Sequence, residues 1–266
     1  MSSPREPERV GRETVPEHGP VAVPDAVAVV IPAKDEVARI AATVRAAAAI
    51  PSVDMVVVVD DGSRDGTAQA ARAAGADVTR HERNRGKGAA MQTGAAYVAR
   101  HEVALVGVDG ASLRALLFVD ADLGDSAANT AALTVPVLAG EADMTIAVLP
   151  QQRQPGGGFG LVINLARRGI EQATGWTPTQ PLSGMRCLTR EAFDAALPLA
   201  AGWGVEVGLS IDLLRKGLRV VEVPCDLHHR VTGRDLRSQL HRGAQYRDVW
   251  RALLARRPAV RRLLRR

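Results

Sequence analysis

Short, continuous apolar runs alternate in the first half of the chain with segments whose apolar residues recur every three or four positions. The runs AVAVVIP (26–32), DMVVVVD (54–60) and RALLFVD, which ends at Asp120, show no polar alternation. Such runs are typical of strands buried on both faces of a parallel sheet. The segments between them predict helices near 36–49, 67–74 and 89–100, with a short strand near 76–80. This order predicts an α/β fold in which right-handed crossovers join mostly parallel strands.

The second half of the chain continues the pattern less regularly. Strands are expected at 142–149 and in LRVVEVP, which ends at Pro224, with helices near 127–138, 161–174, 189–197 and 205–216. Residues 1–24 are polar and rich in proline, which predicts a disordered lead-in. One domain is expected over 25–234. A basic helix and tail, interrupted by Pro258, is expected over 235–266.

Composition narrows the class of protein. Of the 266 residues, 46% are hydrophobic and 24% charged, as in a globular chain, but only 3% are aromatic. So few aromatic rings give little platform for stacking single-stranded nucleic acid, and no nucleic-acid partner is expected. Cys187 and Cys225 are far apart and show no metal-binding spacing, so both are expected to be buried. Neither a signal-peptide core nor a run of 18 apolar residues is present, which predicts a cytoplasmic protein.

The positive charge is concentrated at the end of the chain. The net charge is +5, and residues 251–266 contain seven arginines and no acidic residue. Such an end can bind an anionic surface, so peripheral contact with the inner face of the membrane is one expectation. A solvated, frayed tail is the alternative. The sequence leaves a homodimer open.

Two carboxylates follow the strand that ends at Asp120. Asp120 and Asp122 stand at positions i and i+2 in FVDADLGD. One or two carboxylates plus substrate phosphates are the ligands that Mg²⁺ prefers, and Mn²⁺ suits similar oxygen ligands. A metal there can neutralise a departing diphosphate. A polar turn that caps the strand is the simpler explanation of the pair taken alone. Acidic residues at neighbouring strand ends favour the metal site.

Polar residues also follow the first two strands. VVIPAKDE brings Glu36 after Pro32 and Ala33, and VVVDDGSRDGT places Asp61 after the second strand. Ordinary turns and helix starts account for part of this chemistry. RNRGKG places Lys87 at the start of a helix, where anions bind. The spacing is not that of a Walker A loop, and G-x-G-x-x-G is absent.

Together, I-P-A-x-x-E, V-D-D-G-S-x-D-G-T, G-K-G and V-D-A-D-L resemble the motifs of GT-A glycosyltransferases of the family 2 type. The resemblance runs from about Val27 to Arg234 and implies a Rossmann-like nucleotide-binding half with a mostly parallel sheet, followed by an acceptor half. It implies contacts to the donor nucleotide from seven residues and a catalytic, metal-binding Asp122. The seven are Pro32, Ala33, Glu36, Asp61, Lys87, Asp120 and Ala121.

The second half resembles dolichyl-phosphate mannose synthases and glucosyl-3-phosphoglycerate synthases less closely. PLSGMRCLTREAF implies that Ser183 and Gly184 lie over the sugar and that Arg186 is available to a phosphate; a surface ion pair is the alternative for Arg186. GWGVEVGL implies that Trp203 contacts sugar or acceptor and that Glu206 binds sugar hydroxyls or acts as a base.

VPCDLHHRVTGR follows the last expected strand. The resemblance implies a metal-binding histidine here, His229 or its neighbour His228. Arg230 is expected to be catalytic and Arg234 to contact the acceptor, because either can stabilise a diphosphate or hold an acceptor phosphate.

The expected activity is metal-dependent transfer from a UDP- or GDP-sugar to an acceptor, with Mg²⁺ or Mn²⁺ as cofactor. A polyprenyl phosphate or another phosphate-bearing molecule is the first acceptor considered, and a soluble phosphoglycerate is the alternative. A sugar-1-phosphate nucleotidyltransferase is a further alternative. It normally has a glycine-rich basic loop after the first strand, where this chain has PAKDEVAR.

Overall fold

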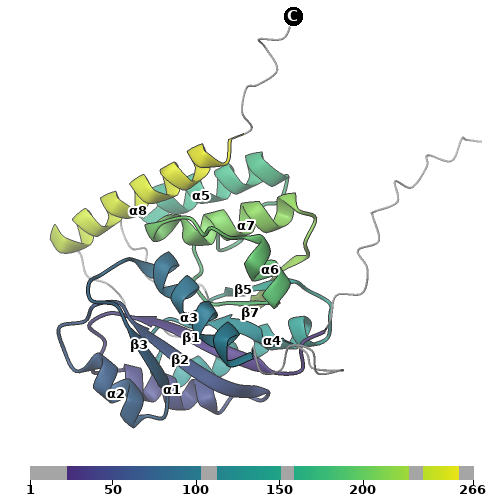
Figure 1. Ribbon diagram of the computed structural model, residues 1–266. Helices are drawn as coiled ribbons and strands as arrows, with labels where there is room; N and C mark the ends of the chain where they lie inside the picture. The colour runs from purple at the N-terminus through teal and green to yellow at the C-terminus, as the bar shows by residue number, and fades with distance from the viewer. Residues whose placement is uncertain (1–22, 103–112, 151–158, 228–235, 258–266) are drawn as a thin grey trace, which may run out of the picture.

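The computed structural model describes residues 23–102, 113–150, 159–227 and 236–257. Within these ranges, seven strands form one sheet in the order β3-β2-β1-β4-β6-β5-β7, with helices on both faces (Figure 1). The strands are β1 (Val27–Ala33), β2 (Val53–Asp60), β3 (Asp77–Arg80), β4 (Ala115–Phe118), β5 (Met144–Val148), β6 (Arg186–Leu188) and β7 (Val220–Pro224).

The sheet is mostly parallel, as the alternation of apolar runs predicts. β1 pairs in parallel with β2 on one side and β4 on the other. The exception is β6, which inserts antiparallel between β4 and β5. The sequence pattern missed β6 because three residues beginning with an arginine carry no readable hydrophobic period.

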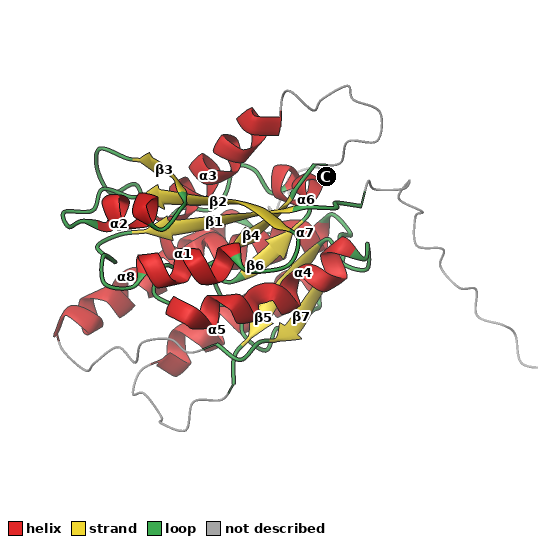
Figure 2. Ribbon diagram, turned by 90° about the horizontal axis from the view of Figure 1, so that it is seen from below, coloured by secondary structure: helices red, strands yellow, loops and turns green. Residues whose placement is uncertain are grey.

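Helices cover the two faces of the sheet as separate layers. One face carries α1 (Ile40–Ala48), α2 (Thr67–Ala73), the 3₁₀ helix η2 (Gly124–Thr130) and α4 (Ala131–Leu138); α1 and α4 lie in front of the sheet in Figure 2. The other face carries α3 (Lys87–Glu102), α6 (Arg190–Ala195) and α7 (Val205–Arg215). In β1, Val29 and Ile31 pack into the first layer and Ala28 and Val30 into the second, because successive side chains point to opposite faces.

A further pair of helices lies outside α7. α5 (Phe159–Thr174) and α8 (Leu236–Ala255) pack against α7 and against each other, and the short 3₁₀ helix η3 (Gly202–Gly204) contacts α8 (Figure 1). Val162, Ile170, Val207, Ile211 and Val249 form their own small core. α8 is thus packed onto the body of the protein.

Gly94 brings α3 against the centre of the sheet. A Cβ built there would overlap the Val30 side chain and stand 3.2 Å from Val59 Cγ2. Only glycine allows this approach, because any side chain would push the helix outward. The close packing fixes the start of α3, and therefore Lys87, relative to β1 and β2.

Three further expectations from the sequence concern the cysteines, membrane spans and the N-terminal segment. Cys187 and Cys225 are both buried, as expected, and burial raises the pKa of Cys225 to about 11. None of the helices in the described ranges combines the length and the apolar character needed to cross a bilayer. Residues 1–22, most of the expected lead-in, lie outside the described residues.

Candidate active site

A cleft of about 700 Å³ lies at the carboxyl ends of β1, β2 and β4. The chain runs from β1 to β2 on one side, and β4 pairs on the other side of β1, so the strand order reverses there. Ligands in open α/β sheets bind at such a reversal. The cleft is lined by Pro32, Ala33, Lys34, Glu36, Asp61, Asn84, Arg85, Gly86, Lys87, Ala90, Asp120, Ala121, Asp122, Gly202, Trp203, Ala244, Arg247 and Asp248.

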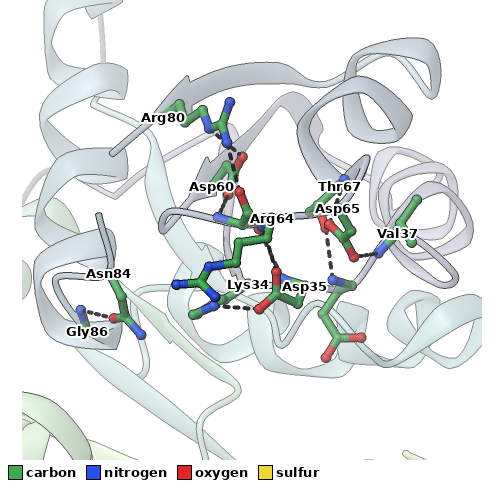
Figure 3. A network of polar contacts seen from close by, with 12 residues as sticks. Lys34, Asp35, Val37, Asp60, Arg64, Asp65, Thr67, Arg80, Asn84 and Gly86 are labelled. Carbon is green, nitrogen blue, oxygen red and sulfur yellow. Dashed lines mark hydrogen bonds and ion pairs between the residues drawn. The ribbon is translucent and has the colours of Figure 1, made fainter. Parts of the chain in front are cut away.

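The loops after β1 and β2 are bonded together at the edge of this cleft (Figure 3). Asp35 has a φ of 56°, in the left-handed region that few residues other than glycine adopt. Its backbone N–H donates to Ser63 Oγ at 3.0 Å, and its Oδ1 accepts from the Arg64 N–H at 2.8 Å. The Glu36 N–H donates to Thr67 Oγ1 at 2.9 Å. These bonds offset the backbone strain and hold Glu36 in place.

Asp61 organises the loop before α3. Its carboxylate accepts from the backbone N–H groups of Arg85 and Gly86, both at 2.8 Å, and lies 2.7 Å from His81 Nδ1. The other ring nitrogen of His81 is 2.9 Å from Thr93 Oγ1 on α3. Asp61 is 5% exposed, so it mainly shapes the loop while presenting one edge to the cleft.

Lys87 lies between two carboxylates from distant parts of the chain. Its Nζ is 2.7 Å from Asp120 Oδ1 and 3.2 Å from Glu206 Oε1. Burial alone would lower the pKa of Lys87, but the charges of Asp120 and Glu206 outweigh it and raise that pKa above the ordinary value. Glu206 is only 4% exposed. The Lys87 cation therefore compensates a charge that would be costly to bury alone.

Side chains of α1 and of the residue before it hold the backbone of the segment from Asp120 to Asp122. Thr43 Oγ1 donates to the Ala121 carbonyl at 2.9 Å and accepts from the Gly124 N–H at 2.9 Å. The Arg39 guanidinium donates to the Asp122 carbonyl at 3.1 Å. With its backbone held on both sides, the segment presents Asp120 and Asp122 at the cleft.

The donor set of the cleft suits a hard cation. Asp120 and Asp122 supply carboxylate oxygens, and diphosphate oxygens can complete the coordination of Mg²⁺ or Mn²⁺. The described residues contain no group of three or more His, Cys, Asp or Glu side chains placed to hold a metal. His229 and His228, expected as a third ligand, lie outside the described residues.

Comparison with known proteins places the chain in a family. Residues 28–195 match the model of glycosyl transferase family 2. The chain belongs to this family. The matched segment covers the strands that carry the acidic cluster, and ends before Glu206 and α8. No curated protein matches the chain.

Solved structures extend the likeness of this glycosyltransferase to most of its length. Glucosyl-3-phosphoglycerate synthase from Mycobacterium tuberculosis with phosphoglyceric acid is 30% identical, with 87% of this chain and 80% of that chain covered and a TM-score of 0.67. The same enzyme with Mn²⁺, uridine diphosphate and phosphoglyceric acid is 28% identical, with 87% of this chain and 78% of that chain covered and a TM-score of 0.67. The structure of this enzyme with Mg²⁺ and uridine diphosphate is 28% identical, with 87% of this chain and 79% of that chain covered and a TM-score of 0.66. The GT-A fold expected from the motifs is confirmed.

Most of the residues expected at the site of this glycosyltransferase meet in one place. The lining residues include Asp61 after β2, Lys87 at the start of α3 and Asp122 after β4, together with the other expected nucleotide-site residues and Trp203. Gly184 and Glu206 adjoin this group because Gly184 packs against the Lys87 ammonium and Glu206 forms an ion pair with it. Ser183 is 7% exposed, and its hydroxyl has no hydrogen-bond partner among the described residues.

Arg186 requires a correction. Its side chain is fully buried, and its guanidinium donates to the Ser183 carbonyl at 2.9 Å and to Ser210 Oγ at 3.0 Å. Burial lowers the pKa of Arg186 to about 10, so the group stays charged near neutral pH. It is therefore neither available to a phosphate nor part of a surface ion pair. Arg230 and Arg234 lie outside the described residues.

Several lining residues were missed from the sequence. Lys34 and Arg85 stand beside recognised motifs and could have been found there. Arg247 and Asp248 are on α8, far along the chain. No local pattern signals their position, because it depends on how α8 packs against η3.

Proposed function

We propose that this glycosyltransferase transfers a sugar from a nucleotide-diphosphate sugar to a phosphate-bearing acceptor, with Mg²⁺ or Mn²⁺ held by Asp120 and Asp122. One observation carries the proposal. Lys87 and Asp120, which are paired with each other, line the same cleft as Asp122, and Lys87 also pairs with the buried Glu206 on α7. Family membership favours sugar transfer over the nucleotidyl-transfer alternative.

The nucleoside is assigned to the side of the cleft formed by β1 and β2. Pro32, Ala33 and Glu36 frame the base and ribose, and Asp61 keeps the loop before α3 in place. UDP-sugars are the first donors to test, because similar solved structures contain uridine diphosphate or UDP-glucose. GDP-sugars are the second.

The metal and the basic groups act on the diphosphate. When bound, the metal neutralises the negative charge that develops on the leaving group. The acceptor oxygen attacks the anomeric carbon, and the bond from that carbon to the diphosphate breaks. The buried Glu206 is already paired with protonated Lys87, which suits it to bind sugar hydroxyls rather than to remove a proton. Arg230 and His229 keep their expected roles at the diphosphate and the metal as proposals.

Phosphoglyceric acid is the first acceptor to test. Similar solved structures contain it together with uridine diphosphate and Mn²⁺, at 28% identity and over 87% of this chain. It carries both a phosphate and a hydroxyl that can attack the sugar.

A polyprenyl phosphate is the second acceptor, and a groove between α5 and α8 favours it. The groove has a volume of about 710 Å³ and is lined by Leu161, Tyr246, Trp250 and Leu254, with Arg168 and Arg257 among the others. Tyr246 and Trp250 are each 46% exposed, which is unusual in a chain so poor in aromatic residues. Rings of this kind favour a membrane interface.

Liposome flotation tests this second acceptor and the proposed peripheral membrane contact. Full-length protein is compared with a variant lacking 258–266, since α8 ends at Ala255 and the next residue, Arg256, still pairs with Asp212 on α7. Binding of the full-length protein to anionic vesicles that is lost in the shortened variant supports the polyprenyl phosphate, and no binding of the full-length protein to anionic or to neutral vesicles excludes it.

The proposed function is tested with a panel of UDP-, GDP- and dTDP-sugars. Metal-dependent donor hydrolysis and thermal stabilisation are measured in wild type, Asp120→Ala and Asp122→Ala. We expect one donor class to respond in the wild type and both variants to lose turnover even with excess metal. Full activity in both variants would refute the metal role, and the absence of any response to the panel would refute nucleotide-sugar binding.

A further inference from the structure

Helix α8 forms the wall of the cleft opposite the strand ends. Ala244, Arg247 and Asp248 line the same cleft as Asp120 and Asp122. Ala244, Arg247 and Asp248 are on α8, which lies outside the segment 28–195 that matches the family. The cleft is therefore bounded by the nucleotide-binding strands on one side and by α8 on the other.

The position of α8 at this wall is fixed by close packing. A Cβ on Gly204 would stand 2.7 Å from both Ala252 Cβ and the Asp248 carbonyl oxygen, so only glycine allows the contact. The Trp203 N–H donates to Asp248 at 3.4 Å. Directly after α8, the Arg256 guanidinium makes two bonds to the Asp212 carboxylate on α7. These contacts hold the Arg247 backbone beside the cleft.

The charges in the cleft are distributed unevenly between its two sides. The strand side carries Glu36, Asp61, Asp120 and Asp122 together with the cations of Lys34, Arg85 and Lys87. Of these cations, Lys34 is already paired with Asp35, and Lys87 is paired with Asp120 and Glu206. On the α8 side, the Arg247 side chain is 58% exposed and pairs with the adjacent Asp248 at 3.1 Å. The Asp248 side chain is only 14% exposed, but the guanidinium end of the pair is open to solvent, which weakens the pair. The guanidinium can therefore exchange Asp248 for a phosphate, which carries more charge.

We propose that Arg247 binds the phosphate of the acceptor, an inference that rests on the function proposed above. The metal and the donor diphosphate are assigned to Asp120 and Asp122, so the acceptor has to approach from the opposite side of the cleft. Its phosphate would be repelled by the acidic strand ends and attracted by Arg247. An arginine fork also matches a phosphate with two parallel hydrogen bonds. Helix α8 is thus the specificity element for a phosphorylated acceptor.

The test compares Arg247→Ala with Arg251→Ala, a second exposed arginine on α8 that does not line the cleft. Transfer from the responding donor is measured with phosphoglyceric acid and with a short-chain polyprenyl phosphate in detergent. For Arg247→Ala we expect the acceptor KM to rise roughly ten- to a hundredfold, the loss of a charge-assisted bond. Its kcat, metal-dependent donor hydrolysis and melting temperature should stay close to wild type. Arg251→Ala should match wild type throughout, and Arg247→Lys should recover part of the KM.

Inorganic phosphate supplies a second readout. It should compete with the acceptor in wild type and compete more weakly in Arg247→Ala. An unchanged acceptor KM in Arg247→Ala, or a rise in Arg85→Ala instead, would overturn this assignment while leaving the proposed function intact. If wild type hydrolyses donor but neither phosphorylated acceptor receives sugar, and phosphate does not inhibit, the phosphate-bearing acceptor itself is wrong. Loss of donor hydrolysis in Arg247→Ala would place the residue at the donor diphosphate and also overturn the assignment.

Discussion

Gly184 lies directly against the ammonium group of Lys87. A Cβ built on Gly184 would overlap Nζ and would stand 3.0 Å from Asp120 Oδ1 and 3.1 Å from Oδ2. The turn before β6 and the first residue of α3 therefore meet at the carboxylate proposed to hold the metal. No side chain fits between them without moving Lys87 or Asp120.

The first prediction concerns this contact. Gly184→Ala should separate Lys87 from Asp120 and lower donor turnover at least tenfold, because a small misplacement of groups at a reacting centre is costly. Metal-dependent hydrolysis measures the effect. Gly243→Ala is the matched control, since a Cβ there meets nothing within 4 Å. Equal activity in the two variants would show that the close packing has no bearing on the reaction.

A second prediction concerns the buried pair of Lys87 and Glu206. Lys87→Met leaves the Glu206 carboxylate, whose side chain is 6% exposed, without its cation. We expect a loss of stability of about 3 kcal/mol, as for other broken buried pairs. Urea unfolding measures it. The double variant Lys87→Met/Glu206→Gln should recover most of the stability but not the activity, which separates the structural from the functional role.

The third prediction concerns His81, which connects Asp61 to Thr93. His81→Ala removes one partner of the Asp61 carboxylate. The loop before α3, whose backbone N–H groups donate to that carboxylate, should then loosen. The donor KM should rise roughly tenfold, the loss of one bond to a charged group, with a smaller change in kcat. His101→Ala is the control, because His101 is exposed and lies at the far end of α3, the helix that carries Thr93. A fall in kcat alone would assign His81 to the chemistry instead.

The fourth prediction is a pH dependence at the edge of the cleft. The hydrogen bond from Lys34 and then that from the Arg64 N–H hold the pKa of Asp35 below its ordinary value of 3.8. A group whose pKa is lowered by folding contributes stability above its unfolded pKa and loses it as the pH falls through the folded value. The bonds of Asp35 with Lys34 and Arg64, drawn in Figure 3, should therefore be intact at neutral pH and weaken below about pH 4.

Melting temperatures of wild type and Asp35→Asn between pH 2.5 and 7 measure this effect. Asparagine tolerates the left-handed backbone but cannot ionise. Wild type should be the more stable protein at neutral pH, and the difference should shrink below about pH 4. A constant difference over the whole range would show that the Asp35 charge does not hold the loop.

Some features of the site could be predicted because they are local. Asp120 and Asp122 follow a buried strand, and Lys87 begins a helix after a glycine turn. The carboxyl ends of parallel strands meet at one edge, so the meeting of Asp61, Lys87 and Asp122 followed from the strand order. Arg186 misled because a motif position does not reveal burial. The short strand β6 directs the Arg186 side chain into the interior, where its guanidinium donates a hydrogen bond to Ser210 Oγ.

The sequence by itself determined the α/β class, the mostly parallel sheet and the strand ends that carry acidic groups, since each depends on hydrophobic period and residue type over a few positions. Only the tertiary structure decided that β6 inserts antiparallel, that Lys87 joins Asp120 to Glu206, and that α8 brings Arg247 to the cleft. These relationships join segments far apart in the chain. They are decided by which surfaces bury each other and which charges must be compensated, and no local pattern records either.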